Sequence, residues 1–341
     1  MRLLQVCNVG TVLGGTGACA WSVTQAVPEW SHRVAVLGPV REDMRAAMAS
    51  IDRGPIPVES IERVTASVLA DADAVLLHNT PRGRVAGEID PPTLLMRHSA
   101  ADHAAATASV CCSQTLRGWL RGRAGENDPV LHQGVPQPAS CGRPRSLGER
   151  VGVVWLCTPQ RRKWPRERIG FCRRLAAACP HVDFTFVGCP TVDRRDYEQA
   201  CGGRATFAPA SVAARRWLSD ADALLYSNRG LPETFGRTVA EAMLAGCIPV
   251  VDDLGGFREQ VTPSTGRLCR DERAFIAALH ELRDPFTRRR LSAAAASHAQ
   301  ARFSHAAFGR RLRQAMTQLL AGEPIAIDEP AATSAAWVAA A

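Results

Sequence analysis

The chain has 341 residues, of which 46% are hydrophobic and 22% charged, a length that suits two domains of ordinary size. No apolar run reaches the roughly 18 residues of a membrane span, and scattered arginines with only 6% aromatic residues argue against a nucleic-acid-binding surface. The net charge of +8 lies in the second half, since residues 1–138 hold 12 Arg against 13 Asp and Glu, whereas residues 139–341 hold 29 basic against 20 acidic residues. This asymmetry favours a small phosphate-bearing ligand in the second half.

The chain opens on a segment that is typical of a first β-strand. Residues 1–10 carry one charge and a short apolar run that stops at Asn8, without the long apolar region or cleavage site of a signal peptide. The twelve cysteines fall singly or as the pair Cys111 and Cys112, with no C-x-x-C unit and no histidine pair at zinc-ligand spacing. We therefore expect a cytoplasmic protein with reduced thiols.

Strand-like and helix-like segments alternate along both halves. In the first half they are Leu3–Cys7, a glycine loop at Gly14–Gly17 with a helix to Val27, then Arg33–Leu37, Ala74–His78 and Thr93–Arg97. In the second half they are Val151–Leu156, the helix Arg166–Ala178, Phe184–Val187, Ala221–Ser227, the helix Gly236–Ala245 and Ile248–Val251. Such alternation predicts an α/β protein of two Rossmann-like, doubly wound domains.

Composition suggests the domain boundaries. Residues 139–148 are rich in Pro, Ser and Gly and form the expected linker between an N-terminal domain at 1–138 and a C-terminal domain at 149–304. A periodic helix at 305–322 can pack back toward the N-terminal domain, and the Ala- and Pro-rich residues 323–341 form an expected disordered tail. Because ligands bind outside the carboxyl ends of the strands in such sheets, two facing domains predict a cleft there.

Two acidic pairs resemble metal-binding aspartates: Asp71 with Asp73, and Asp220 with Asp222. Both pairs precede a buried strand, so they are expected at the amino ends of the strands, facing away from the cleft. We predict no metal site at either pair.

The segment Ser227–Val251 is the most informative part of the sequence. It runs from a strand through a loop and a helix into the next strand, with Glu233 in the loop and Glu241 in the second helical turn. At a rise of about 1.5 Å per residue, Glu241 is expected roughly 7 to 8 Å deeper along the helix, so the two carboxylates can hold two parts of one long ligand. Gly236 allows close backbone approach, and the free amides of the helix start suit a phosphate.

Glu233 and Glu241, with Phe235 and Gly236 between them, resemble the E-x7-E donor motif of the family 4 glycosyltransferases, which have the two-domain GT-B fold. The similarity continues to Val261. The resemblance implies that Glu241 holds the ribose hydroxyls of a nucleotide sugar and that Glu233 contacts the transferred sugar.

The remaining residues of the same motif complete the expected donor site. The resemblance implies main-chain contacts from Phe235 and Gly236 to sugar and phosphate, and we include the adjoining Thr234 and Arg237 among the donor-binding residues.

Lys163 is the only lysine among 41 basic residues. The lysine ammonium is a compact point charge, whereas the arginine guanidinium is planar and forked. A site that needs the compact charge would therefore retain a lysine in a chain that otherwise uses arginine. Lys163 follows a predicted strand, where the family carries a lysine and an arginine that bind the donor phosphates and stabilise the departing diphosphate. In the family the arginine usually lies five residues before the lysine, a position that Thr158 occupies in this chain. Arg161 or Arg162 is therefore the expected substitute, and we include Arg162 among the donor-binding residues.

The glycine loop after the first strand has two interpretations. Gly15, Gly17 and Ala20 fit a dinucleotide fingerprint, but no acid follows the second strand to hold a nicotinamide ribose. The resemblance implies instead a loop between donor and acceptor, with Gly15 on the donor side and Gly14 and Thr16 on the acceptor side.

Two histidines end predicted strands of the first half. His78 resembles the family's histidine at the sugar site and is the predicted catalytic partner of Lys163 and Glu233. Asn79 and His98 are further acceptor-side candidates.

The resemblance implies a hexosyltransferase-type enzyme that moves a sugar from a nucleotide-sugar donor to a hydroxyl of an acceptor, with retention and without a metal or other cofactor. We expect a small soluble acceptor of natural-product or aminocyclitol type. A non-catalytic nucleotide-sugar-binding protein is the first alternative, favoured by the displaced arginine, and a sugar-nucleotide epimerase of the same fold is the second. Peripheral membrane contact is not expected, because the basic segment Leu116–Arg121 is interrupted by Gly118.

Overall fold

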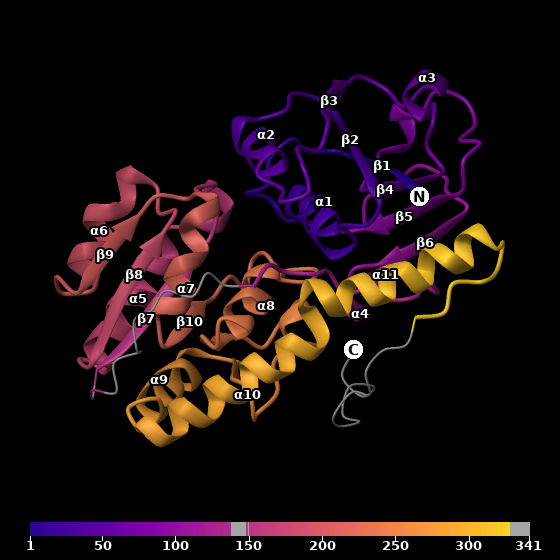
Figure 1. Ribbon diagram of the computed structural model, residues 1–341. Coiled ribbons are helices and arrows are strands. Elements are labelled where there is room, and N and C mark those ends of the chain that lie inside the picture. Colours follow the sequence, from indigo (N-terminus) through magenta and orange to yellow (C-terminus); the bar gives the residue numbers. More distant parts are fainter. Residues whose placement is uncertain (138–147, 149, 328–341) are drawn as a thin grey trace.

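The computed structural model describes residues 1–137, 148 and 150–327. Within these residues the chain forms two six-stranded parallel sheets, with strand orders β3-β2-β1-β4-β5-β6 and β12-β11-β10-β7-β8-β9. Figure 1 shows the two sheets, each with its own helices, in two adjacent lobes. This architecture confirms the predicted pair of doubly wound α/β domains.

The first sheet comprises β1 (Arg2–Cys7), β2 (Ser31–Leu37), β3 (Val58–Ile61), β4 (Ala74–His78), β5 (Thr93–Arg97) and β6 (Ala108–Cys111). Its helical segments are α1 (Gly15–Ala26), α2 (Glu42–Ala49), α3 (Ala66–Leu69), η1 (Arg82–Arg84) and α4 (Gln114–Trp119). The strands β3 and β6 were not predicted. Both are four-residue edge strands without a fully buried apolar run, so they lack the sequence pattern of the central strands.

The second sheet comprises β7 (Val151–Leu156), β8 (Val182–Val187), β9 (Ala205–Ala208), β10 (Ala223–Tyr226), β11 (Ile248–Asp252) and β12 (Arg267–Cys269). Its first helical segments are η2 (Arg161–Lys163), α5 (Glu167–Ala178), η3 (Thr191–Asp193), α6 (Arg194–Ala200), η4 (Val212–Arg215) and α7 (Arg216–Asp220). They are followed by α8 (Arg237–Leu244), η5 (Gly255–Phe257), α9 (Glu272–Glu281), α10 (Pro285–Phe303) and α11 (His305–Leu320).

The C-terminal helices begin at side chains that cap them. Asp284 accepts hydrogen bonds from two backbone amides of α10, and Pro285 occupies the first turn, where no amide partner is needed. Ser304 ends α10 and its hydroxyl accepts a hydrogen bond from the amide of Ala307, so one residue separates two long helices. This break lets α11 take a different direction from α10.

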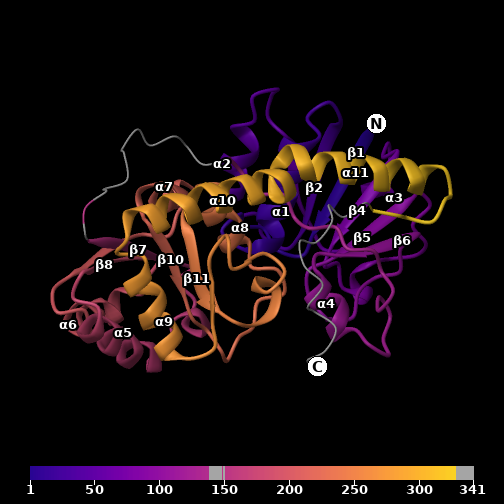
Figure 2. The ribbon, with the colours of Figure 1, turned by 90° about the horizontal axis from the view of Figure 1, so that it is seen from below.

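Helix α11 lies on the N-terminal lobe, and α10 lies on the C-terminal lobe (Figures 1 and 2). A Cβ atom at Gly309 would lie 2.2 Å from the carbonyl oxygen of Ala26, so glycine is needed where α11 crosses the end of α1. Arg313 forms an ion pair with Glu29 at 2.6 Å just beyond the crossing. The last two helices thus connect the lobes on one side.

Two of the expected segments lie largely outside the described residues. These are the linker at 139–148, of which Gly148 alone is described, and residues 328–341 of the expected tail. Residues 323–327 of that tail are held in place, because Ile325 and Ile327 pack against the core and the amide of Ala326 donates to Gln318 at 3.0 Å.

The helices of the described ranges are all too short or too polar to cross a membrane.

Candidate active site

A pocket of about 520 Å³ lies between the lobes at the carboxyl ends of both sheets. On the N-terminal side it is lined by the loops after β1, β4 and β5, and on the C-terminal side by the loops after β7 and β10 and by the start of α8. This is the position that the topology of parallel sheets predicts, and its volume lies in the range of small-molecule sites.

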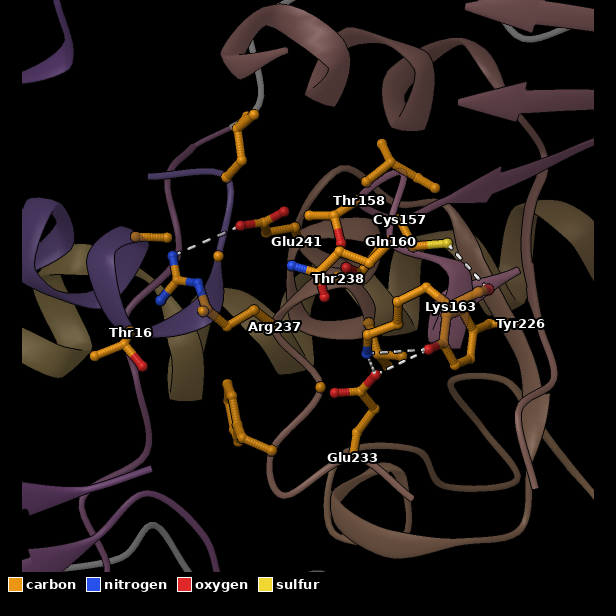
Figure 3. Close-up of a pocket in the computed structure, with 18 of the residues that line it drawn as sticks. Thr16, Cys157, Thr158, Gln160, Lys163, Tyr226, Glu233, Arg237, Thr238 and Glu241 are labelled. Carbon is orange, nitrogen blue, oxygen red and sulfur yellow. Dashed lines mark hydrogen bonds and ion pairs between the residues drawn. The ribbon is translucent and has the colours of Figure 1, made fainter. Parts of the chain in front are cut away.

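Lys163, Tyr226 and Glu233 form a connected group at one end of the pocket (Figure 3). The ammonium of Lys163 donates to the carboxylate of Glu233 and lies 3.4 Å from the hydroxyl of Tyr226, which donates to the same carboxylate oxygen at 2.8 Å. Burial and the adjacent Glu233 carboxylate raise the pKa of Tyr226, so its hydroxyl stays protonated and remains a donor.

Glu241 lies in another part of the pocket, nearer the N-terminal lobe (Figure 3). Its carboxylate is 3.2 Å from Arg215 and 3.6 Å from Arg237, and its side chain is 8% exposed. The structure therefore separates the two carboxylates of the motif: Glu233 faces a lysine and Glu241 faces two arginines.

Arg237 links the two lobes beside Glu241. Its guanidinium donates to the side chain of Gln133 at 3.1 Å, to the carbonyl of Gly134 at 2.8 Å and to the hydroxyl of Ser22 at 3.1 Å. Burial lowers the pKa of Arg237 and the Glu241 carboxylate opposes that effect. Arg237 lines the pocket, but its two terminal guanidinium nitrogens are engaged in these contacts between the lobes.

The adjacent residues Arg161 and Arg162 of η2 have different environments, and only Arg162 lines the pocket. Arg162 lines the pocket beside Lys163, and its side chain donates to Gln160 at 2.9 Å. Arg161 forms an ion pair with Asp193 and does not line the pocket. Of the two candidates left open by the sequence, Arg162 is the one that shares the pocket with Lys163.

The loop from Glu233 to Gly236 is held by close backbone packing. Gly236 has a φ of +86°, which favours glycine, and a Cβ atom there would lie 2.4 Å from the ring of Phe257. The amide of Gly256 donates to the carbonyl of Glu233 at 2.8 Å. Phe235 is buried, and its carbonyl accepts a hydrogen bond from Gln260, so this loop offers backbone atoms to the pocket from a fixed position.

Thr234 and Glu259 join loops of the C-terminal lobe to the N-terminal lobe. The hydroxyl of Thr234 donates to the carbonyl of His98 at 3.0 Å. The carboxylate of Glu259 accepts hydrogen bonds from the amides of Gln114 and Thr115 at 2.8 and 2.9 Å, and lies 3.0 Å from His132. Both contacts cross between the lobes next to the pocket, and no sequence pattern indicated either.

The two candidate histidines differ in their access to the pocket. His98 lines it, whereas His78 is fully buried and does not. Burial lowers the pKa of His78 to about 3, and burial together with the neighbouring His78 and Arg237 lowers the pKa of His98 well below 6.5. His78 lies behind His98, with 3.2 Å between Nδ1 of His78 and Nε2 of His98, so His98 takes the position in the wall that was predicted for His78.

A chain of hydrogen bonds fixes the protons of both rings. Because the Gln133 carbonyl oxygen accepts from Arg237, its amide nitrogen donates to Nδ1 of His98 at 3.1 Å. Neutral His98 then carries its proton on Nε2 and donates to Nδ1 of His78, whose Nε2 donates to Gln5 at 3.0 Å. Both ring nitrogens of His98 are therefore engaged, and neither can accept a proton from a substrate.

Cys19, His78 and His98 place one potential metal-ligand atom each within 4.8 Å of one another, all buried in the described part of the chain. Burial raises the pKa of Cys19 to about 12, which disfavours the thiolate that binds metals. In this arrangement the ring nitrogens of both histidines take part in the hydrogen bonds described above.

The loop after β1 places Gly14, Gly15 and Thr16 in the pocket, at the start of α1. This helix has no side-chain cap and no acid in its first turn, so its amino end contributes positive potential. A Cβ atom at Gly15 would lie 3.8 Å from the side chain of Arg237, and one at Gly17 would lie 2.1 Å from the carbonyl of Thr11. Gly17 is therefore needed for close packing against the backbone of Thr11, whereas Gly15 faces the side chain of Arg237 without a steric conflict.

Sequence reasoning missed Arg215, Tyr226 and Gln133. Tyr226 ends β10, so the rule that ligands bind at the carboxyl ends of strands could have identified it. Arg215 and Gln133 carried no local signal, because their contacts with Glu241 and Arg237 join residues far apart in the chain.

Comparisons with known proteins concern the C-terminal half of the chain and its fold. A family model described as "Glycosyl transferases group 1" matches residues 165–284, which contain the loop and helix of the two glutamates. No curated protein sequence matches the chain significantly.

Several solved structures are similar over nearly the whole chain. HepE of Anabaena, solved in complex with UDP-glucose, has a TM-score of 0.71 at 16% identity, covering 93% of this chain and all of its own. Sucrose-phosphate synthase from Thermosynechococcus elongatus has a TM-score of 0.65 at 16% identity, covering 95% of this chain and 100% of its own. The chain has the GT-B fold. AviGT4, a glycosyltransferase involved in avilamycin A biosynthesis, is similar with a TM-score of 0.61 at 17% identity, covering 94% of this chain and 98% of its own.

Proposed function

We propose that this protein is a retaining glycosyltransferase of the family 4 type, which transfers a sugar from a nucleotide-sugar donor to a hydroxyl group of a small acceptor. One observation carries the proposal: Lys163 with Glu233, and Glu241 separately, face a single pocket between the two sheets. The match of residues 165–284 to the glycosyltransferase model and the similarity to HepE, solved with UDP-glucose, support it.

The proposed donor lies along the C-terminal wall of the pocket. Glu241 would accept hydrogen bonds from the ribose hydroxyls, and Lys163 and Arg162 would contact the diphosphate. The amino end of α1 at Gly15 would add positive potential from the opposite wall. Glu233 and the backbone from Thr234 to Gly236 would contact the transferred sugar.

The ion pair between Lys163 and Glu233 prepares both groups for the donor. Lys163 is held between a carboxylate and the hydroxyl of Tyr226, with its side chain 15% exposed. A diphosphate would attract the ammonium, and Glu233 would become available to a sugar hydroxyl. Because these groups already face the pocket, little reorganisation would be needed when charge develops on the leaving diphosphate.

The acceptor proton would go to the departing phosphate oxygen. His98 does not serve as the base, because hydrogen bonds engage both of its ring nitrogens. Lys163 and Arg162 would supply the positive charge that a metal ion supplies in other enzymes, so the proposed reaction requires no metal or other cofactor. As a separate point, we propose a cytoplasmic location.

The test is to incubate the purified protein with a panel of nucleotide sugars and pooled acceptors, and to measure released nucleoside diphosphate and glycosylated product by mass spectrometry. We expect both products, and NMR should show that the anomeric configuration of the donor sugar is retained. The rate of product formation should be the same with and without EDTA. Tight nucleotide-sugar binding without release would support the non-catalytic alternative. Conversion of the donor to its epimer without acceptor would support the epimerase alternative.

A further inference from the structure

The charged side chains that line the pocket come from one side of it. Among the described residues they are Arg162, Lys163, Arg215, Glu233, Arg237 and Glu241, all from the C-terminal lobe. The wall formed by described residues of the N-terminal lobe contains no Asp, Glu, Lys or Arg.

The N-terminal wall of the pocket is lined by polar but uncharged side chains. Thr16 and Ser99 provide hydroxyl groups, and Asn79 provides an amide. Asn79 adopts a φ of +51° and its side-chain oxygen accepts a hydrogen bond from the backbone amide of His98 at 2.8 Å, so its orientation is fixed. Leu13, 36% exposed, adds an apolar surface beside them.

His98 adds no charge to this wall. Its hydrogen bonds with Gln133 and His78 define a neutral ring whose two nitrogens are both engaged. Burial, together with the neighbouring His78 and Arg237, also keeps the pKa of His98 well below 6.5. The N-terminal wall is therefore uncharged at neutral pH.

The charges of the opposite wall are already committed. On that wall the proposed donor takes Lys163 and Arg162 for its diphosphate and Glu233 for its sugar, while Glu241 is paired with Arg215 and Arg237. The amino end of α1, on the N-terminal wall, also faces the proposed donor diphosphate. A phosphorylated acceptor would find no cation of its own on the N-terminal wall, and an ammonium group would find no carboxylate. Removing such a charge from water without a partner is unfavourable.

We propose that the acceptor is an uncharged polyhydroxyl compound, bound by Asn79, Thr16 and Ser99 on the N-terminal wall, an inference that rests on the proposed glycosyltransferase function. This excludes aminocyclitols in their cationic form and sugar phosphates as preferred acceptors. The sugar hydroxyls of the acceptor would exchange hydrogen bonds with the amide and hydroxyl groups, and its apolar face would lie against Leu13.

The test compares matched acceptors with the full-length protein and whichever nucleotide sugar it turns over. Each set contains a neutral compound, its phosphate and its amine: glucose with glucose 6-phosphate and glucosamine, and inositol with inositol 1-phosphate and an aminoinositol. We expect kcat/KM for the neutral member to exceed that of both charged members by at least about tenfold. A charged member that equals or exceeds its neutral counterpart overturns the proposal.

A variant extends the test to the wall itself. Leu13→Arg places a cation on the N-terminal wall and should raise the ratio of kcat/KM for phosphorylated over neutral acceptors by about tenfold or more. Val212→Arg is the matched control, because Val212 is similarly exposed, at 37%, but lies on the C-terminal wall. An unchanged ratio in Leu13→Arg, or an equal shift in both variants, contradicts the proposal.

Failure of the proposed function gives a different result. In that case no nucleoside diphosphate is released from any donor with any acceptor, neutral or charged, and the acceptor proposal fails with it. Release that depends on a charged acceptor leaves the glycosyltransferase function intact and refutes only the acceptor class.

Discussion

Replacing Lys163 with methionine removes the cation beside Glu233 and keeps an unbranched side chain of similar length. At an effective dielectric constant of about 20, a unit charge about 4 Å from a phosphate oxygen contributes about 4 kcal/mol, and loss of one well-placed donor to a developing anion costs about 10²- to 10³-fold in kcat. We therefore expect kcat for Lys163→Met to fall by about 10² to 10³. Glu233 keeps the hydrogen bond from Tyr226 and is 25% exposed, so unfolding free energy should change by about 1 kcal/mol or less.

The assay is steady-state release of nucleoside diphosphate, combined with urea unfolding of the same preparations. Arg161→Met is the matched control, because Arg161 belongs to the same turn but pairs with the buried Asp193 outside the pocket. It should lose about 1 to 3 kcal/mol of stability and retain kcat. A Lys163→Met variant with less than about a threefold loss of kcat, or an Arg161→Met variant with the larger loss, would refute the assignment of Lys163 to the leaving diphosphate.

Three further predictions concern the motif and its supports. Glu241→Gln should raise the donor KM about 10- to 100-fold with a smaller change in kcat, since the ribose lies away from the reacting bond; steady-state kinetics with an unchanged KM would exclude the ribose contact. Burial raises the pKa of the Glu259 carboxyl, but the hydrogen bonds that the carboxylate accepts outweigh burial, so the pKa in the folded protein lies below 4.5. The ionised carboxylate therefore stabilises the fold above pH 4.5, and this contribution is lost as the pH falls through the folded pKa. The stability difference between wild type and Glu259→Gln, measured by urea unfolding, should therefore shrink from pH 7 to about pH 3, and a constant difference would contradict this linkage. Gly236→Ala forces a Cβ atom to within 2.4 Å of Phe257 at a φ of +86° and should lower the unfolding free energy by about 2 kcal/mol or more. Gly83→Ala, with nothing within 4 Å, should change it by less than about 0.5 kcal/mol in the same measurement, and equal effects would remove the steric explanation.

The sequence by itself determined the central strands and the location of the donor loop. Buried parallel strands such as Ala74–His78 need continuous apolar residues, and that local requirement is visible in the sequence. The loop and helix from Glu233 to Glu241 depend on residues within one short segment, with Gly236 in the left-handed conformation before the helix. Local chemistry also singled out Lys163, which the structure places at the end of the pocket beside Glu233.

Only the tertiary structure decided which side chains share the pocket. The sequence could not choose between Arg161 and Arg162, because neighbouring residues of a tight turn point in different directions and the partner of Arg161, Asp193, lies 32 residues away in the chain. It also could not place His98 in the wall and His78 behind it, since that order follows from the packing of two adjacent strands. The pairing of Glu241 with Arg215 requires η4 and α8 to approach each other, which no periodicity within either segment encodes. Local patterns specify the elements, whereas these contacts join segments that are far apart in the sequence and form only when the elements pack together.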